Sequence, residues 1–139
     1  MRRMSEDRIS YYVSEARKFL EAAFKEFERG EKECRDVLIR DAAEKAWNAI
    51  IQATNALLIS KGLPEEKIRS HRDRRLALNS LELRGPEMRA KGFRDRFGAG
   101  EHYLHEMCFY EGEYLPEGVK DDLLKARSYI EDVEKALKG

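Results

Sequence analysis

The sequence has few residues of the kinds that cross-link, bend or disorder a chain. Its 139 residues include two cysteines, Cys34 and Cys108, too few for a disulfide framework and without the paired CxxC spacing of a zinc site. Three prolines and nine glycines, with 42% hydrophobic residues, exclude the composition of a disordered chain. We therefore expect one folded domain over residues 1–139, with each cysteine a small buried or half-buried side chain.

Long apolar runs and amides are also scarce. No stretch of about 18 consecutive apolar residues occurs, and the N-terminal sequence MRRMSEDRIS becomes charged before a secretion signal could form. We expect a cytoplasmic protein without a membrane partner. One glutamine and three asparagines stand against 39% charged residues, a composition typical of proteins from thermophilic sources.

The common catalytic motifs are missing. The sequence contains no GxSxG, no phosphate-binding GxxxxGK[ST], no GxGxxG after a strand and no HExxH. We expect no cofactor and no metal site. The best metal alternative combines His102, His105 and Glu106 on one helix with His71 supplied by another.

Positive charge is concentrated in one segment of a chain that is neutral overall. Residues 69–96 contain nine Lys or Arg against four acidic residues, a surplus of five that the rest of the chain balances. Such a segment can bind RNA or another anion, and Arg72, Arg75 and Arg94 are our candidate binding residues within it. The alternative is a solvated helix face with ion-pair partners elsewhere.

Apolar residues recur every three or four positions, which predicts an all-α antiparallel bundle of four to five helices. The expected helices cover 5–30, 35–61, 70–83, 101–111 and 115–137, with one short charged piece at 87–96. Two adjacent apolar stripes make the second helix the central one. Ser70 is expected to cap the third helix, and Gly98-Ala99-Gly100 is expected to interrupt the helix before residue 101.

The expected helix at 101–111 carries most of the candidate chemistry. Drawn at 100° per residue, it places Tyr103, Met107 and Tyr110 toward the core, flanked by Leu104. His102, His105 and Phe109 fall on the other side. A face with two of the three histidines and an exposed aromatic ring suggests a covered surface, either a homodimer interface or a ligand cleft.

Each histidine on that helix has a carboxylate one turn away. Glu101 precedes His105 by four residues, and Glu106 follows His102 by four. Such pairing fixes an imidazole tautomer or favours its charged form, which suits acid/base chemistry and surface pairing equally. Glu101, Phe109, His105 and Tyr110 are therefore further site candidates.

Metal-independent RNA cleavage is one chemistry these residues could support. An arginine would hold the scissile phosphate and a histidine would move protons during attack by the ribose 2′-OH. Arg96 and His102, separated by five residues, are the candidate pair, with Tyr110 or Glu101 orienting them. The alternative is that Arg96 is solvated and His102 simply pairs with Glu106.

Two stretches of the sequence resemble a known family. Residues 40–49 (RDAAEKAWNA) and 104–112 (LHEMCFYEG) are similar to the signature stretches of the PaREP-type archaeal family, which is placed among HEPN-like helical domains. The resemblance follows the helix order from Ile9 to Leu137, although only these two stretches are specific. It implies an antiparallel helical bundle that commonly forms dimers.

The HEPN-like superfamily includes RNA-cleaving toxins as well as noncatalytic modules associated with RNA or nucleotides. Its ribonucleases carry an arginine, four to six residues and then a histidine, a spacing that Arg96 and His102 meet. The chain departs from this pattern at Phe97, where a polar residue is usual. His105, the histidine within the similar stretch, lies outside the spacing.

Three functions follow from these observations and from the resemblance. The first is a dimeric HEPN-like module that binds RNA, a nucleotide or a partner protein. The second is a metal-independent ribonuclease, a toxin with an antitoxin-like nucleotidyltransferase partner. The third is a purely structural homodimer.

Overall fold

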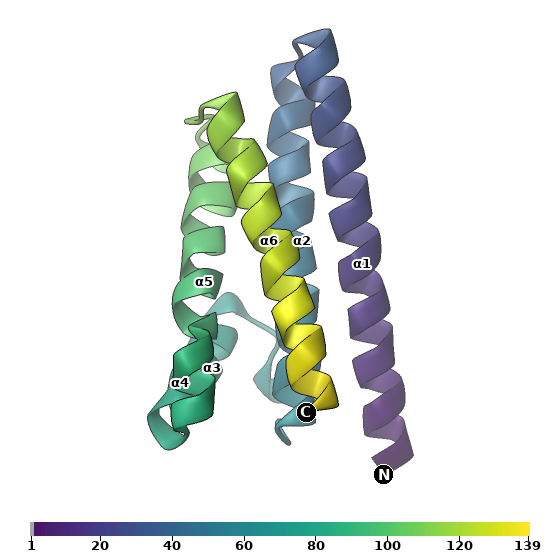
Figure 1. The fold of residues 1–139 in the computed structure, drawn as a ribbon, viewed down its shortest axis with the longest axis vertical. Coiled ribbons are helices and arrows are strands. Elements are labelled where there is room, and N and C mark those ends of the chain that lie inside the picture. The colour runs from purple at the N-terminus through teal and green to yellow at the C-terminus, as the bar shows by residue number, and fades with distance from the viewer. Residues whose placement is uncertain (1) are drawn as a thin grey trace.

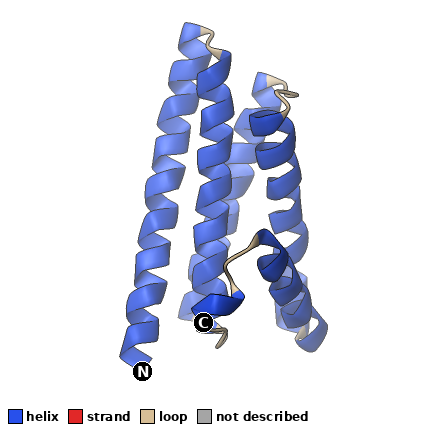
Figure 2. Ribbon diagram, turned by 180° about the vertical axis from the view of Figure 1, so that it is seen from behind, coloured by secondary structure: helices blue, strands red, loops and turns tan. Residues whose placement is uncertain are grey.

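The computed structural model describes residues 2–139, with side chains from residue 3 onward. The described chain consists of helices joined by turns and loops and contains no strand (Figure 2), as the sequence predicts. Six α-helices form where four to five were expected, because the middle of the chain is divided into short pieces. The elements are α1 (Arg2–Glu33), α2 (Asp36–Ser60), the 3-10 turn η1 (Glu65–Lys67), α3 (His71–Arg84), α4 (Pro86–Lys91), α5 (Phe93–Gly100), the π-helix η2 (Glu101–Tyr110) and α6 (Pro116–Lys138).

Four long rods form the body of the molecule. Helices α1, α2 and α6 run side by side, and α5 continues into η2 to make the fourth rod (Figure 1). Helix α1 is antiparallel to α2, since Glu26 near the end of one binds Lys45 in the first half of the other. Helices α3 and α4 lie against the α5 end of the fourth rod. This arrangement leaves α2 surrounded on most sides, as its two apolar stripes predict.

The first helix continues one turn beyond its expected end at Gly30. Gly30 is helical and buried, and a Cβ there would lie 2.8 Å from Cγ1 of Ile39, so the glycine allows α2 to pack closely. The turn instead comes at Cys34, which has a φ of 53° in the left-handed region. Cys34 is exposed, which corrects the expectation that both cysteines are at least half buried.

The expected break at Gly98-Ala99-Gly100 is wrong. Gly100 has φ −61° and ψ −43°, so the helix passes through the glycines into η2. A Cβ on Gly100 would lie 2.8 Å from Cδ1 of Ile50, which makes this glycine a point of close approach to α2. The actual break is at Gly92, whose φ of 66° separates α4 from α5 within the piece expected at 87–96.

Continuity of this rod changes which side chains are buried in η2. The buried row runs from Phe93 and Phe97 through Gly100 to Leu104 and Cys108, a spacing of four, three, four and four. Burial raises the pKa of the Cys108 thiol to about 12. The predicted core face is therefore wrong except for the flanking Leu104, which is buried. Its members Tyr103 and Tyr110 are exposed, at 49% and 64%, and Met107 is only partly buried.

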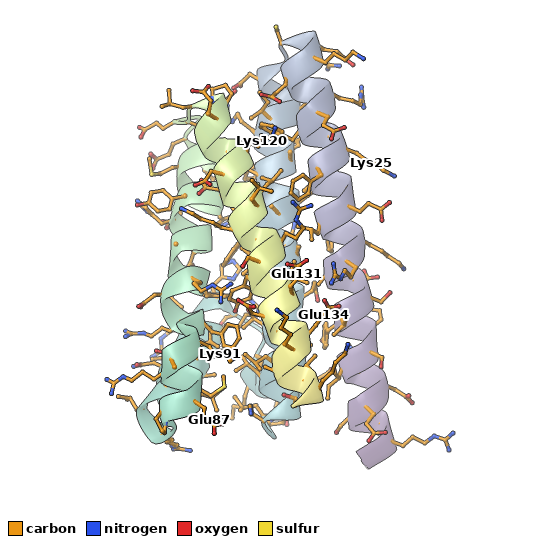
Figure 3. All side chains as sticks on the ribbon, viewed as in Figure 1. Lys25, Glu87, Lys91, Lys120, Glu131 and Glu134 are labelled. Carbon is orange, nitrogen blue, oxygen red and sulfur yellow. The ribbon has the colours of Figure 1, made fainter. Side chains whose placement is uncertain are left out.

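Helix α6 begins at Pro116 and buries a row of apolar side chains at a spacing of three and four, Val119, Leu123, Ala126, Ile130 and Val133. Charged side chains cover the outer surfaces of the rods, as Lys25 and Lys120 illustrate in Figure 3. Glu134 instead lies between α6 and α1, where its Oε2 accepts a 3.1 Å hydrogen bond from Nε of Arg17. In the described part of the chain, no helix combines the length and apolarity needed to cross a membrane.

Candidate functional site

Two histidines that are distant in sequence meet at the junction of α2, α3 and η2. The ring centroids of His71, the first residue of α3, and His105, in the middle of η2, lie 5.5 Å apart. Both rings also contact the indole of Trp47 on α2, at 5.2 Å for His71 and 5.7 Å for His105. Two imidazoles thus meet on the buried indole ring of Trp47.

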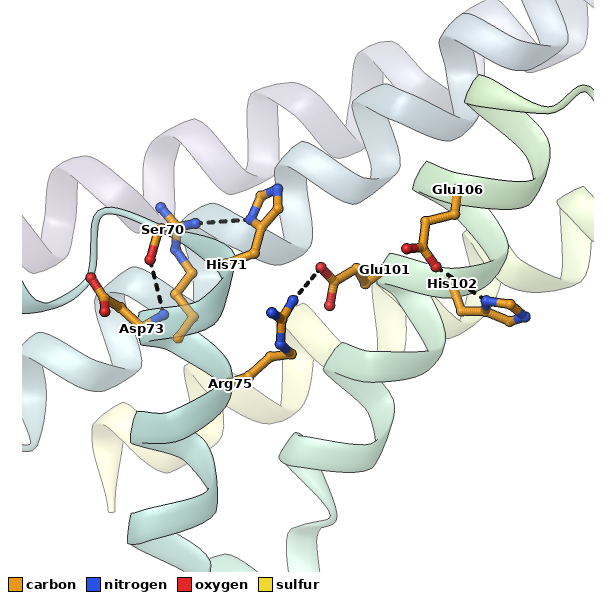
Figure 4. Close-up of polar contacts among 8 residues, drawn as sticks. Ser70, His71, Asp73, Arg75, Glu101, His102 and Glu106 are labelled. Carbon is orange, nitrogen blue, oxygen red and sulfur yellow. Dashed lines mark hydrogen bonds and ion pairs between the residues drawn. The ribbon is translucent and has the colours of Figure 1, made fainter.

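Local structure fixes the position of His71. Oγ of Ser70 accepts a 3.0 Å hydrogen bond from the backbone N–H of Asp73, so the predicted cap begins α3 (Figure 4). One turn later, Nε of the buried Arg74 donates to Oδ1 of Asn55 on α2 at 2.8 Å. This charge-assisted bond anchors α3 to the central helix and leaves His71 at the junction.

A carboxylate from α2 orients His105. Nδ1 of His105 lies 2.7 Å from Oε1 of Glu44, and both side chains are largely shielded from solvent. Because a carboxylate only accepts, Nδ1 carries the proton and donates it. When the ring is neutral, its lone pair is on Nε2, the arrangement of a histidine oriented to accept a proton.

His71 has the opposite tautomer. Nη1 of Arg74 lies 3.1 Å from Nδ1 of His71, and a guanidinium can only donate, so Nδ1 accepts and the proton of the neutral ring is on Nε2. Burial lowers the pKa of His71, and the positive charge of Arg74 lowers it further, against a smaller raising effect from Glu101. His71 is therefore a neutral N–H donor beside the proton acceptor of His105.

The indole of Trp47 has a buried N–H group without a hydrogen-bond partner among the described residues. The indole ring of Trp47 is 1% exposed, and its Nε1–H has no acceptor among the described residues. A buried donor without a partner costs about 1–3 kcal/mol. The ring also packs on Phe97 at 4.9 Å, so Trp47 connects the histidine pair to the hydrophobic core.

Arg96 and His102, the predicted catalytic pair, are not brought together. Arg96 faces α6, where Nη1 binds Oδ2 of Asp132 at 2.9 Å and the guanidinium lies over the ring of Tyr129. His102 is exposed and points away from His71 in Figure 4, with Nδ1 3.2 Å from Oε1 of Glu106. The expected pairing of His102 with Glu106 is therefore present.

The pairing expected between Glu101 and His105 is wrong. Glu101 instead accepts a 2.5 Å hydrogen bond from Nη1 of Arg75, one residue after Arg74 on α3 (Figure 4). This occurs because η2 continues α5, which turns Glu101 toward α3 and His105 toward α2. The Arg75–Glu101 pair therefore joins α3 to the start of η2.

Aromatic side chains extend the site along η2. The ring of Tyr110 lies 4.9 Å from that of His105, and the ring of Phe109 is stacked at 6.4 Å. Arg40 of α2 holds this end, because its guanidinium donates to the carbonyl oxygens of Phe109 and Tyr110 at 2.8 Å and 2.9 Å. The structure thus keeps these two predicted residues next to His105.

The predicted phosphate-binding arginines lie on the neighbouring surface. Arg75 and Arg94 line one open hollow between α3 and α5, and Arg72 is exposed one turn before Arg75. The guanidinium groups of Arg72 and Arg94 have no hydrogen bond or ion pair to any other described side chain. Both guanidinium groups are therefore available to an anion.

Sequence reasoning missed Glu44, Trp47 and Arg74 as site residues and considered His71 only as a metal ligand. Glu44 and Trp47 lie three residues apart within the family-like stretch 40–49, which is the signal that points to them. Among the described residues, no group of three or more His, Cys, Asp or Glu side chains is arranged to hold a metal ion.

Comparison with known proteins gives the family of the chain. No curated protein and no solved structure matches it significantly. The model of the archaeal PaREP1/PaREP8 family matches residues 11–130, which include both histidines and all of α2. The protein belongs to the archaeal PaREP1/PaREP8 family.

Proposed function

We propose that the protein is a HEPN-like dimeric binding module for phosphate-bearing ligands, RNA or nucleotide, on the surface formed by α3, α5 and η2. The observation that carries the proposal is the pair of unpaired guanidiniums, Arg72 on α3 and Arg94 on α5, on the surface where these two helices line one open hollow. Guanidinium groups bind phosphate. His71, the first residue of α3, supplies an imidazole N–H donor on the same helix as Arg72.

The test is binding of a labelled single-stranded RNA, measured by fluorescence anisotropy over a range of salt concentrations. The variant Arg72→Ala/Arg94→Ala should bind more weakly, and the slope of log K against log salt should fall by about 0.7 for each lost phosphate contact. The matched control is Lys120→Ala/Lys135→Ala, which removes two exposed charges from α6. Binding that is absent, independent of salt, or equally weakened by both double variants contradicts the proposal.

The homodimer is part of the same proposal. Val37 and Tyr110 are 52% and 64% exposed and line one hollow with Phe109, at the far end of η2 from the arginines. A second copy covering this hollow would remove apolar surface from water. Light scattering at micromolar concentration should give twice the protomer mass, and Val37→Lys should give one protomer mass. Leu83→Lys, an exposed apolar site on α3, should stay dimeric.

A second candidate function is metal-independent RNA cleavage, which the opposite tautomers of the histidine pair favour. His105 would accept the proton of a ribose 2′-OH through Nε2 as the 2′-oxygen attacks the adjacent phosphorus. His71 would donate an Nε2–H hydrogen bond to a phosphoryl oxygen, which stabilises the developing charge. The P–O5′ bond breaks, a 2′,3′-cyclic phosphate forms, and His105 returns the proton to the 5′-oxygen. A toxin of this kind would need an antitoxin partner, for which a small nucleotidyltransferase is our candidate.

Cleavage of RNA in the presence of EDTA separates the two functions. The variants His105→Gln and His71→Gln should each cleave about 100-fold to 10,000-fold more slowly, because each removes one proton-transfer or hydrogen-bonding group. The variant His102→Gln should cleave at the wild-type rate. If His102 or Arg96 substitutions abolish cleavage while His105→Gln does not, the pair predicted from sequence spacing is the catalytic one. If no variant alters cleavage, or none occurs, the protein is a binding module only.

A further inference from the structure

A third hollow lies on the other side of the fourth rod, between the α5–η2 junction and α6. It is a cavity of about 160 Å³ with walls formed by Ile50, Gly100, Leu104 and Ala126. Its volume is close to that of the roughly 150 Å³ apolar cavity known to hold benzene in an engineered protein. The cavity is thus large enough for one small ring or branched aliphatic group.

Small residues leave this space open. Gly100 cannot fill it, since a Cβ there would meet Ile50, and Ala126 on α6 presents only a methyl group although it is 1% exposed. An unfilled cavity of this size costs stability, about 24 cal/mol for each Å³ in a well-studied series. A leucine at position 126 would be the ordinary way to fill it.

Three charged side chains line the cavity, Arg96, Lys125 and Asp122. The two cations are paired with carboxylates outside the lining, Arg96 with Asp132 at 2.9 Å and Lys125 with Asp121 at 3.3 Å. The carboxylate of Asp122 has no hydrogen bond or ion pair to any other described side chain. Asp122 is therefore the one charged side chain of the lining without a partner among the described residues.

The environment of Asp122 makes that charge unfavourable without a partner. Asp122 is half buried, and burial raises the pKa of its carboxyl group, with Lys125 acting in the opposite direction. A cation placed in the cavity would restore the partner that the carboxylate lacks. An anion would instead face Asp122 directly, with Arg96 already bound to Asp132.

We propose that the cavity between α5–η2 and α6 binds a small organic amine, with its apolar body against Gly100, Leu104 and Ala126 and its ammonium group on the carboxylate of Asp122. This site is separate from the histidine pair, because it lies against α6 and uses none of the residues of the proposed RNA surface. A bound amine would contact both α6 and the α5–η2 rod and would stabilise their packing. The protein would then respond to a small amine independently of RNA.

The test uses benzylamine, with benzyl alcohol and benzoate as neutral and anionic probes of the same shape. Amide chemical shifts from ¹⁵N-labelled protein should change at residues 96–104 and 122–129 on saturable addition of benzylamine. Benzyl alcohol and benzoate should bind at least about tenfold more weakly. The variant Asp122→Asn should reduce the affinity for benzylamine to that for benzyl alcohol, whereas Glu117→Gln, which removes an exposed carboxylate of α6 outside the cavity, should leave the preference unchanged.

A second experiment tests the proposal by filling the cavity with a larger side chain. Ala126→Leu should abolish binding of all three probes and raise the midpoint of thermal unfolding. If that variant misfolds, Ala99→Leu at the exposed edge of the cavity tests the same point. The proposal is overturned if benzylamine fails to saturate, if its shifts map elsewhere, if benzoate binds better, or if Asp122→Asn has no effect.

Discussion

The two halves of the molecule differ in how they use buried surface. The frame, formed by α1, α2 and α6, consists of long helices whose interior is almost entirely apolar, with Thr54 and Tyr129 as a hydrogen-bonded buried pair at 2.6 Å. The edge, formed by α3, α4 and the α5–η2 rod, has short helices, a π-helix and a buried arginine. Regular packing thus belongs to the part that confers stability, and irregular packing to the part that holds the polar side chains of the candidate site.

Truncation of the frame should have the largest effect. Leu123 of α6 is fully buried, so Leu123→Ala should lower the free energy of unfolding by about 2–5 kcal/mol. Its neighbour Leu124 is 39% exposed, and Leu124→Ala should cost clearly less, under about 1 kcal/mol. Urea unfolding of both variants measures the difference, and equal losses would mean that the frame does not carry the stability.

The two glycines of the edge rod should respond differently to the same substitution. Gly98 is helical, and no atom lies within 4 Å of the position that a Cβ would take, so Gly98→Ala should stabilise the protein by up to about 1 kcal/mol. Gly100→Ala should gain less or lose stability, because its Cβ would meet Ile50. Thermal unfolding compares the pair. A larger gain at Gly100 would show that the close approach to α2 is not tight.

The smallest effect is expected from the protonation of His71, which is only partly buried. Its pKa is lower in the folded protein than the usual 6.5, so the unfolded chain binds more protons below that pH. The stability contributed by neutral His71 is present above about pH 6.5 and is lost as the pH falls toward the folded pKa. Unfolding midpoints between pH 7 and pH 5 should fall less steeply in His71→Gln than in the wild type. An equal fall in both proteins would contradict the assignment to His71.

The frame could be predicted from sequence because its signal is local. Apolar residues repeating every three or four positions place the central helix and the buried row of α6 without reference to the rest of the chain. The helix boundaries of the edge could not be predicted in this way, because the conformation of its glycines depends on side chains that are distant in sequence. Gly98 and Gly100 read as a turn, but only the position of Ile50 reveals Gly100 as a point of helix contact.

The candidate site was only partly predictable for a related reason. His105 and Phe109 could be identified because they share one face of the expected helix, whereas Tyr110, expected on the core face, contacts His105 only in the structure. The partner of His105 is Glu44, 61 residues away, and nothing in local spacing connects the two. Arg96 and His102, the catalytic pair predicted from spacing, instead lie on different sides of the rod. The rod is helical between them, so its turn points the two side chains in different directions.

The π-helix has a consequence for how the length of this chain can change. Its hydrogen bonds, such as that from the N–H of Glu111 to the carbonyl of Glu106, close over five residues instead of four, so the segment holds a surplus residue relative to an α-helix. Loss of a single residue between 101 and 104 could be absorbed by reverting to the α-helical ladder, with little cost in hydrogen bonding. Because an α-helix turns further per residue than a π-helix, the shortened segment would turn about as far as the original, and His105 would keep its position against Glu44 and Trp47. The π-helix thus makes both the fold and the histidine pair tolerant of a one-residue deletion in this segment.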